Sequence, residues 1–403
     1  MDYIIIGNGV AGTEAAKAIR RNDNLSEIKI FSQDHYLFYS RPRLPELLAK
    51  EVNAEDIFVH NYEWYNKNKI QLFLNCTVKH VDPKNQKITL KDTSCFTYSK
   101  LPLATGSSSA LPPIDGINTP EGVFTLRTVE DALTITKHAS LTRTATLIGG
   151  GLLGLEAGNG LRKLGLSVTV VEIFDRLLPR QLDSEGSVIL QKQMEEMGLK
   201  FLLGAQSKSI KESGHTKIVE LKDGSIVESN FILVSAGIKP NITLAREAGI
   251  AVNKGIIVND RMETDLTNIY AAGDAAEYNG RMYGIWPAAQ RQGVITGINM
   301  SGGKEVYKGT VPSTTLKVAG IHLTSMGDIA AEDKTIEQIK VADPSKNIYK
   351  KLFLKDGKIV GAILLGETKN AAEITQLMEN KTDVGNYKEK ILDTMFDFRN
   401  LSK

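Results

Sequence analysis

The sequence has few cysteines, few histidines and no long apolar run. Only Cys76 and Cys95 occur in 403 residues, which excludes a disulfide framework and favours a reducing cytoplasm. No segment approaches the roughly 18 apolar residues of a membrane span. The 6 histidines lack metal-ligand spacing, and a net charge of +2 attracts neither nucleic acid nor a membrane. We therefore expect a cytoplasmic globular protein without metal, nucleic-acid or membrane partners.

Two glycine-rich segments each follow an apolar run that is typical of a buried strand. Their glycines are Gly7, Gly9 and Gly12 in the first segment, and Gly149, Gly151 and Gly154 in the second. Glycine at these spacings permits a tight turn, close approach of a pyrophosphate, and close packing of the next helix. The phosphates then lie at the helix N-terminus, where free N–H groups and the helix dipole favour anions. Two such segments predict two dinucleotides, and therefore a flavin that a nicotinamide reduces.

The order of elements predicts that the second dinucleotide-binding domain is inserted into the first. The first domain begins with a strand over Ile4–Ile6, a helix over Gly12–Arg21 and a strand over Glu27–Phe31. The proline pair at 112–113 marks the crossing into the second domain, and residues 237–241 mark the return. The sequence thus predicts an α/β fold with two Rossmann-like domains.

Four further stretches have the alternation that is typical of short strands. Cys76–Val81 and Lys87–Leu90 predict a hairpin, and Cys95 lies in the following hairpin segment. Beyond residue 301, Thr315–Val318 and Lys350–Leu354 indicate a small C-terminal α+β domain.

The charged tail from Lys381 contains an apolar stripe at helical spacing. The stripe consists of Tyr387, Ile391, Met395 and Phe398. The spacing predicts a helical tail over 381–403. Docking of the stripe on its own protein is the favoured interpretation, and docking on a partner is the alternative.

Two later motifs carry a family resemblance. Ala104, Thr105 and Gly106 form a turn after an apolar strand, and residues 270–274 end in Gly273 and Asp274. With the phosphate loops, these motifs resemble the FAD-dependent pyridine nucleotide-disulfide oxidoreductase superfamily over residues 1 to about 365. The chain is most similar to clostridial-type NADH:rubredoxin reductases and to the flavin portion of NAD(P)H nitrite reductases. The resemblance implies that these residues and the first loop bind FAD, with Asp274 accepting from the ribityl chain.

The two crossings and the change of patterning after residue 301 predict the domain boundaries. The FAD-binding domain would comprise residues 1–112 and 242–305, and the inserted NAD-binding domain residues 113–241. The C-terminal α+β domain would comprise residues 306–380, before the tail at 381–403.

The second loop resembles the family's NAD(H) site. Glu172 ends the next strand about 20 residues after the glycines, where a carboxylate accepts from the ribose 2′-OH. A 2′-phosphate would be repelled there, which favours NADH, although Arg176 lies nearby. The matching position in the first domain is Ser32, so that Asp34 is the alternative ribose ligand. Gly237, at the second crossing, completes the candidate cofactor-binding residues.

Catalytic candidates follow from the same resemblance. Glu156 matches a carboxylate near the nicotinamide, although the helix dipole alone would also stabilise an acid there. Relatives that pass electrons to ferredoxins often have a lysine where this chain has Glu46, and Lys50 is the candidate replacement one turn later. Trp286 matches a segment that passes the flavin edge, with a plain core role as the alternative.

Two arginines in the same region are candidate ligands of the flavin pyrophosphate. Arg41 and Arg43 flank a proline in an extended segment of the first domain. Their alternative interpretation is as surface arginines of a loop.

One feature of the disulfide-reducing members of the superfamily is absent from this chain. Disulfide reductases carry redox cysteines on the helix after the first βαβ unit, whereas Tyr39–Leu48 contains none. Electrons are therefore expected to leave the reduced flavin directly, for a one-electron carrier such as rubredoxin or an iron–sulfur protein. One alternative is an FAD/NAD subunit of a larger iron–sulfur or metal-containing oxidoreductase complex. Another is an NADH-sensing flavoprotein that regulates a binding partner.

Overall fold

The computed structural model describes residues 1–118, 121–318, 320–329, 333 and 335–402, and the chain divides into two compact units. Unit 1 comprises Met1–Arg41, Asn53–Ser108 and Ile238–Thr310, and unit 2 comprises Pro42–Val52, Ser109–Gly237 and Val311–Lys403. Residues 42–52 therefore group with the inserted segment, as do the C-terminal residues. In the described part of the chain, no helix is both long and apolar enough to cross a bilayer.

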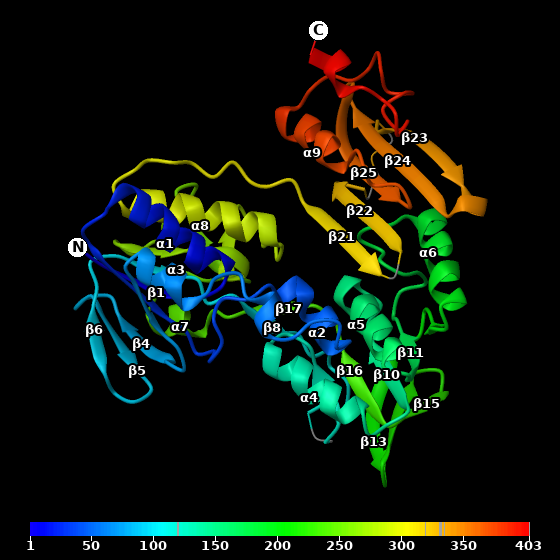
Figure 1. Ribbon diagram of the computed structural model, residues 1–403, viewed down its shortest axis with the longest axis horizontal. Helices are drawn as coiled ribbons and strands as arrows, with labels where there is room; N and C mark the ends of the chain where they lie inside the picture. Colours follow the sequence, from blue (N-terminus) through cyan, green and yellow to red (C-terminus); the bar gives the residue numbers. More distant parts are fainter. Residues whose placement is uncertain (119–120, 319, 330–332, 334, 403) are drawn as a thin grey trace. The chain divides into compact units, whose positions relative to one another are not determined.

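Unit 1 is built on a parallel sheet in the order β19-β7-β1-β2-β3 (Figure 1). Its strands are β1 (Asp2–Ile6), β2 (Glu27–Phe31), β3 (Ile70–Phe73), β7 (Leu101–Leu103) and β19 (Ile269–Ala271). Ile4 and Ile5 point to opposite faces of β1 and both are fully buried. Burial on both faces explains the continuous apolar runs of these strands.

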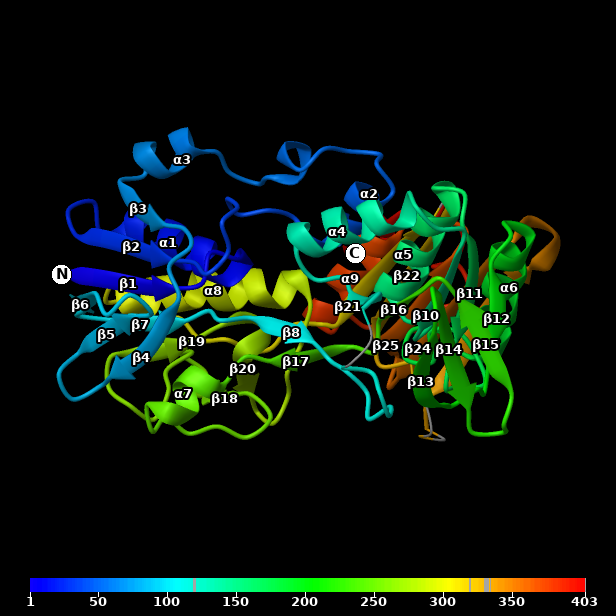
Figure 2. The ribbon, with the colours of Figure 1, turned by 90° about the horizontal axis from the view of Figure 1, so that it is seen from below.

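Helices α1 (Val10–Asn22) and α8 (Trp286–Met300) lie side by side on this sheet in Figures 1 and 2. Glycines of α8 permit the close approach. A Cβ on Gly293 would lie 2.4 Å from the Ala11 carbonyl oxygen, and one on Gly297 would lie 2.3 Å from the Ala15 carbonyl oxygen. These distances are far below van der Waals contact, so the pairing of α1 with α8 requires glycine at both positions.

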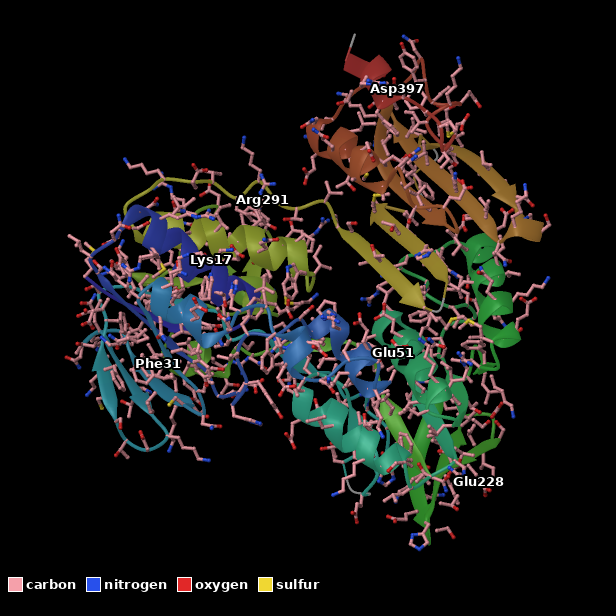
Figure 3. The ribbon with its side chains drawn as sticks, in the orientation of Figure 1. Lys17, Phe31, Glu51, Glu228, Arg291 and Asp397 are labelled. Carbon is pink, nitrogen blue, oxygen red and sulfur yellow. The ribbon has the colours of Figure 1, made fainter. Side chains whose placement is uncertain are left out.

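A small antiparallel sheet lies beside the parallel one in unit 1. Its strands are β4 (Val78–Asp82), β5 (Lys87–Leu90) and β6 (Cys95–Thr97). The predicted hairpin is confirmed, but Cys76 precedes its first strand. Phe31, labelled in Figure 3, packs on Phe96 with ring centroids 4.9 Å apart and so ties this sheet to β2.

Short elements complete unit 1. They are the helices α3 (Tyr62–Lys67) and α7 (Thr243–Glu247), the paired strands β8 (Ser107–Ser109) and β17 (Ile238–Pro240), and the paired strands β18 (Ile256–Val258) and β20 (Ala276–Tyr278). The β8–β17 pair lies where the chain leaves unit 1 and where it returns.

Unit 2 repeats the parallel architecture with the strand order β12-β11-β10-β16-β9. The strands are β9 (Val123–Thr125), β10 (Thr144–Ile148), β11 (Ser167–Val171), β12 (Lys200–Leu202) and β16 (Phe231–Val234). The helices are α4 (Val129–Ala139), α5 (Leu152–Lys163) and α6 (Ser184–Glu196), and the antiparallel strands are β13 (Ser207–Ser213), β14 (Thr216–Leu221) and β15 (Ile226–Ser229). The chain is an α/β protein with two Rossmann-like sheets.

The short helix α2 (Leu44–Leu48) packs on α4 and α5 within unit 2. The Thr136 hydroxyl donates to the Leu48 carbonyl at 3.0 Å. A Cβ on Gly160 would lie 3.0 Å from the Leu48 side chain, so α2 sits close on α5. Lys163 of α5 pairs with Glu51, which Figure 3 labels beside that helix.

The C-terminal part of unit 2 is an antiparallel sheet in the order β21-β22-β25-β24-β23 with one long helix. Its elements are β21 (Ser313–Val318), β22 (Ile321–Gly327), β23 (Glu337–Asp343), β24 (Ile348–Lys355), β25 (Lys358–Leu365) and α9 (Ala371–Asn380). Asp183, the N-cap of α6, accepts from the Tyr349 hydroxyl at 2.6 Å and from Lys351 at 2.7 Å. Burial opposes ionisation of Asp183, but these donors outweigh it and hold its pKa below the usual value. The carboxylate thereby links α6 to β24.

The predicted helical tail is wrong. Residues 383–396 run through turns, and only a 3₁₀ helix at Phe398–Ser402 follows. The buried Lys350 explains this, since its ammonium donates to the Leu392 carbonyl at 3.2 Å and to the Thr394 hydroxyl at 2.8 Å. Tertiary contacts of this kind override a short periodic pattern. Ile391 is fully buried in the domain core, as self-docking requires, whereas Met395 is 84% exposed.

The seam between α1 and α8 yields a stability prediction. Gly297→Ala should lower the free energy of unfolding by about 1–3 kcal/mol, because its new methyl group overpacks the seam. Denaturant unfolding followed by circular dichroism measures the change. Gly158→Ala in α5 is the matched control, since its Cβ would meet Leu199 at an ordinary 3.4 Å. Equal losses in both variants would show that the close approach is not the cause.

Candidate functional site

The first phosphate loop connects β1 to α1 and rests directly on the end of β7. Gly7 has a φ of +113°, and a Cβ there would lie 2.1 Å from the Ala104 carbonyl oxygen. A Cβ on Gly12 would lie 2.0 Å from the Gly7 carbonyl oxygen. Any side chain at either position would push the loop off the sheet. The glycines at the two ends of this loop are therefore required by backbone packing alone.

The second loop repeats this geometry between β10 and α5. A Cβ on Gly149 would lie 2.3 Å from the Ser235 carbonyl oxygen, and one on Gly154 would lie 2.4 Å from the Gly149 carbonyl oxygen. A Cβ on Gly151, in contrast, would meet no described atom within 4 Å. The middle of the loop thus faces open space, where a phosphate can approach the backbone.

Both loop helices begin without a side-chain cap. Gly9 is the N-cap of α1 and Gly151 is the N-cap of α5, and neither position supplies a capping hydrogen bond. Elsewhere in unit 2, Thr128 caps α4 and Asp183 caps α6. The first N–H groups of α1 and α5 remain available for an anion, which fits two dinucleotide diphosphates.

A cluster of small side chains brings the predicted flavin motifs together in unit 1. Ala11, Ala104, Ala272 and Ala289 form one buried contact group that draws on the first loop, the 104–106 turn, the 273–274 turn and α8. A Cβ on Gly273 would lie 3.1 Å from that of Ala11. Small residues at this point keep all four segments near the N-terminus of α1.

Hydrogen bonds fix the two turns at this point. The Gly273 N–H donates to the Gln292 side-chain oxygen at 2.8 Å, and the Ser107 hydroxyl donates to Asp274 at 2.6 Å. The Thr105 hydroxyl donates to the Asn241 carbonyl at 2.8 Å. Gly106 follows with a φ of +65° and open space beside it. The 104–106 and 273–274 turns are thus held in place by side chains from β8 and α8.

Arg41 reaches the first loop from the extended segment after β2. Its guanidinium lies 5.5 Å from the centre of the Tyr39 ring, and a Cβ on Gly9 would lie 3.5 Å from one of its terminal nitrogens. Its Nε is buried with no hydrogen-bond partner in the described residues. An unpaired buried donor beside a phosphate loop is consistent with a pyrophosphate ligand.

The ribose candidates of the first domain lie at the carboxyl end of β2. Ser32 is buried, and its hydroxyl accepts from the Asp34 N–H at 3.2 Å. The Asp34 carboxylate accepts from the Tyr39 hydroxyl at 2.8 Å. Asp34 is thus already held by the segment that carries Arg41.

Arg43 and Lys50 belong to unit 2. The Arg43 side chain donates to Glu46 at 2.8 Å. Lys50 follows α2 with a φ of +58° and an exposed side chain. The roles predicted for both residues stay predictions.

Glu172 lies directly behind the second loop. Its carboxylate accepts from the Gly150 N–H at 2.5 Å and from the Phe174 N–H at 3.0 Å. A carboxylate offers about four lone-pair sites, so it retains the capacity to accept a ribose hydroxyl. The Arg176 side chain donates to Asp175 at 3.1 Å.

The remaining candidates lie on helix starts and at the second crossing. Glu156 is half-buried and lies beyond the first turn of α5, where the dipole effect has already weakened. Trp286 begins α8, is half-buried, and stacks on Phe38 with ring centroids 5.6 Å apart. Gly237 has a φ of +100°, which explains the glycine at that turn.

Sequence reasoning missed two residues of this site. Gln292 holds the 273–274 turn, and Asn8 lies within the first loop with a buried side-chain amide. Asn8 was visible as a polar residue between two loop glycines. Nothing in the sequence placed Gln292, which lies 19 residues from the turn it holds.

Neither cysteine lies in the α2 segment. Cys76 is half-buried and precedes β4, whereas Cys95 is exposed at the start of β6, with its sulfur 3.6 Å from the Thr89 hydroxyl. Within the described ranges, no group of three or more His, Cys, Asp and Glu residues is placed to hold a metal ion.

Comparison with known proteins agrees with this geometry. Residues 1–293 match the pyridine nucleotide-disulphide oxidoreductase family, and residues 312–382 match the rubredoxin NAD+ reductase C-terminal domain. The crystal structure of NADH:rubredoxin oxidoreductase from Clostridium acetobutylicum has a TM-score of 0.79 at 29% identity, and the match covers 95% of this chain and 96% of that one.

Curated relatives differ in length. The assimilatory nitrate reductase electron transfer subunit of Bacillus subtilis is 37% identical over 97% of this chain and 51% of its own length. The NADH-rubredoxin oxidoreductase of Clostridium acetobutylicum is 31% identical over 95% of this chain and 96% of its own length. The chain spans about half the length of the first of these relatives and nearly all of the second. This chain belongs to the pyridine nucleotide-disulphide oxidoreductase family, and its cofactors are FAD and NAD(H).

Proposed function

We propose that this protein takes electrons from NADH onto FAD and passes them to a one-electron carrier protein such as rubredoxin, without a redox-active cysteine. FAD, when bound, accepts a hydride and can release electrons singly. The observation that carries the proposal is the composition of the α2 segment. The stretch from Tyr39 to Leu48 lacks the cysteines that disulfide-reducing relatives use.

The residues of α2 that occupy this cysteine-free stretch are packing residues. Leu44, Leu47 and Leu48 are buried, and α2 packs on α4 and α5. The helix thus serves as an apolar anchor on unit 2. Cys76 and Cys95 lie in unit 1 around the small β4–β6 sheet, whereas α2 belongs to unit 2.

The choice of a carrier protein is supported by the C-terminal domain. Its match is to a domain of rubredoxin NAD+ reductases, and the full-length relative from Clostridium acetobutylicum is named an NADH-rubredoxin oxidoreductase.

Membership of a larger complex is the second candidate. The Bacillus subtilis relative is an electron transfer subunit of nitrate reductase, and another relative is the epsilon subunit of phenylglyoxylate dehydrogenase from Aromatoleum evansii, 30% identical over 95% of this chain. Copurification from the native host separates the candidates, because a subunit would be recovered with stable partners.

Three side chains are proposed to act during turnover. Glu156 on α5 would lie near the nicotinamide, Trp286 would flank the flavin, and Lys50 would replace the lysine of ferredoxin-reducing relatives. Cytoplasmic location is proposed with them, since NADH is the electron donor.

Rapid-mixing kinetics test the acceptor. The enzyme should be reduced by NADH and then reoxidised much faster by rubredoxin than by ferredoxin, oxygen or nitrite. Fast reduction followed by slow reoxidation with every acceptor would contradict the carrier-reductase proposal and favour an NADH sensor. Absence of any NADH reduction would contradict the whole scheme.

The absence of a redox cysteine predicts the electron capacity of the protein. Dithionite titration should consume two electrons per FAD, because no disulfide stores another pair. The double variant Cys76→Ser, Cys95→Ser should retain electron transfer with FAD bound. Consumption of four electrons per flavin, or lost turnover in the FAD-loaded variant, would mean that a cysteine takes part.

The position of Glu172 predicts a preference for NADH. Glu172→Ala should raise the KM for NADH and weaken discrimination against NADPH, with a loss of about 1–2 kcal/mol for a charge-assisted hydrogen bond. Steady-state kinetics with both nucleotides measure the change. Glu172 also accepts from the Gly150 N–H, so its removal changes a contact of the loop as well as the proposed ribose contact. Arg176→Ala is the control, because it changes a nearby charged side chain and keeps the bond between Glu172 and Gly150. Equal use of NADPH by the wild type would contradict the ribose assignment.

A further inference from the structure

Asn8 is the one polar side chain inside the first glycine loop, between Gly7 and Gly9. The residue is only 8% exposed, and its side-chain nitrogen is buried without a partner in the described part of the chain. A buried amide N–H left without an acceptor is costly, so a buried donor at such a position calls for a partner. The Nε of Arg41 is also buried without a described partner, and a terminal nitrogen of the same side chain would lie 3.5 Å from a Cβ on Gly9. The Asn8 side chain and the Arg41 side chain, both near the first phosphate loop, thus each have a buried N–H donor without a described acceptor.

Tyr65 of α3 fixes the orientation of the Asn8 amide. Its hydroxyl donates to the Asn8 side-chain oxygen at 2.9 Å, and the Thr13 hydroxyl lies 3.5 Å from the same atom. Burial raises the pKa of Tyr65 to about 12, so at neutral pH the hydroxyl keeps the proton that it donates to the Asn8 side-chain oxygen. The amide oxygen is therefore the end that faces Tyr65, and the NH₂ end is turned away from it.

The surroundings hold Tyr65 in turn. The Phe38 backbone forms a hydrogen bond with the Tyr65 hydroxyl, and the Phe38 ring stacks on Trp286 of α8. Trp64, the neighbour of Tyr65, stacks on His60 with ring centroids 3.8 Å apart. The side chain that orients Asn8 is thus fixed by the extended segment after β2 and by α3, all within unit 1.

We propose that the Asn8 side-chain nitrogen donates a hydrogen bond to the diphosphate of FAD and that Tyr65 is the residue that positions it. The NH₂ group is a donor only and phosphate oxygens are acceptors only, so the two are complementary. The uncapped start of α1 and the guanidinium of Arg41 supply the other donors around the same anion. The assignment concerns FAD affinity and is independent of the electron acceptor.

Binding of FAD to the apoprotein tests the proposal. Asn8→Ala should raise the Kd for FAD about 10-fold, the usual effect of one hydrogen bond to a charged group. Asn8→Asp should raise it further, because a carboxylate cannot donate and repels the diphosphate. Tyr65→Phe should give a smaller rise, since the amide remains but is free to flip. Quenching of flavin fluorescence during titration measures each Kd.

Comparison of Asn8→Ala with Tyr65→Phe separates a ligand contact from a packing role. Asn8→Ala also removes the acceptor of the buried Tyr65 hydroxyl, so its apoprotein stability should fall. Tyr65→Phe loses the same hydrogen bond but keeps the Asn8 NH₂ group, so FAD affinity should fall further in Asn8→Ala than in Tyr65→Phe. Thr296→Val is the matched control, because Thr296 is fully buried on α8 and its hydroxyl likewise has no hydrogen-bond partner among the described residues. That variant should bind FAD normally.

Three results would overturn the proposal. One is FAD affinity in Asn8→Asp equal to that in Asn8→Ala. Another is FAD affinity that falls as far in Tyr65→Phe as in Asn8→Ala. The third is measured on the wild type and applies even if no variant folds. The NMR signal of the ¹⁵N-labelled Asn8 side-chain amide should shift when FAD is added, and an unshifted signal would contradict the contact.

Discussion

Contact between one backbone and another at the phosphate loops is the constraint on which the rest of this structure depends. Gly7 lies against the Ala104 carbonyl, and Gly149 lies against the Ser235 carbonyl, at distances that admit no side chain. Each contact holds a loop against the end of the neighbouring strand and so fixes the position of the helix N-terminus that follows the loop. Because the N–H groups there have no side-chain cap, both helix starts can accept an anionic ligand.

The two glycine loops have the same backbone geometry but differ in the side chains that surround them. The loop at Gly149 has the buried Glu172 behind it, and the Glu172 carboxylate accepts a loop N–H. The loop at Gly7 has donors instead, since Arg41 and Asn8 both carry buried nitrogens without described partners. Acceptors suit the hydroxyls of a ribose and donors suit a diphosphate, so the two loops offer different contacts to a dinucleotide.

Side-chain contacts hold the parts of unit 2 together. The apolar helix α2 is anchored on α4 and α5 through Leu48 and Gly160. The Asp183 carboxylate links α6 to the C-terminal sheet through Tyr349 and Lys351. The parallel sheet and the C-terminal sheet thus belong to one compact unit.

The sequence by itself determined the α/β class, both phosphate loops and the two cofactors, because glycine spacing after an apolar strand is a local requirement of backbone geometry. Only the tertiary structure decided how distant segments meet. Gln292 holds a turn 19 residues away, and Tyr65 orients an amide 57 residues away, and neither contact leaves a local pattern. The tail was misjudged for the same reason: its helical spacing is local, whereas the buried Lys350 that binds Leu392 and Thr394 comes from a distant strand.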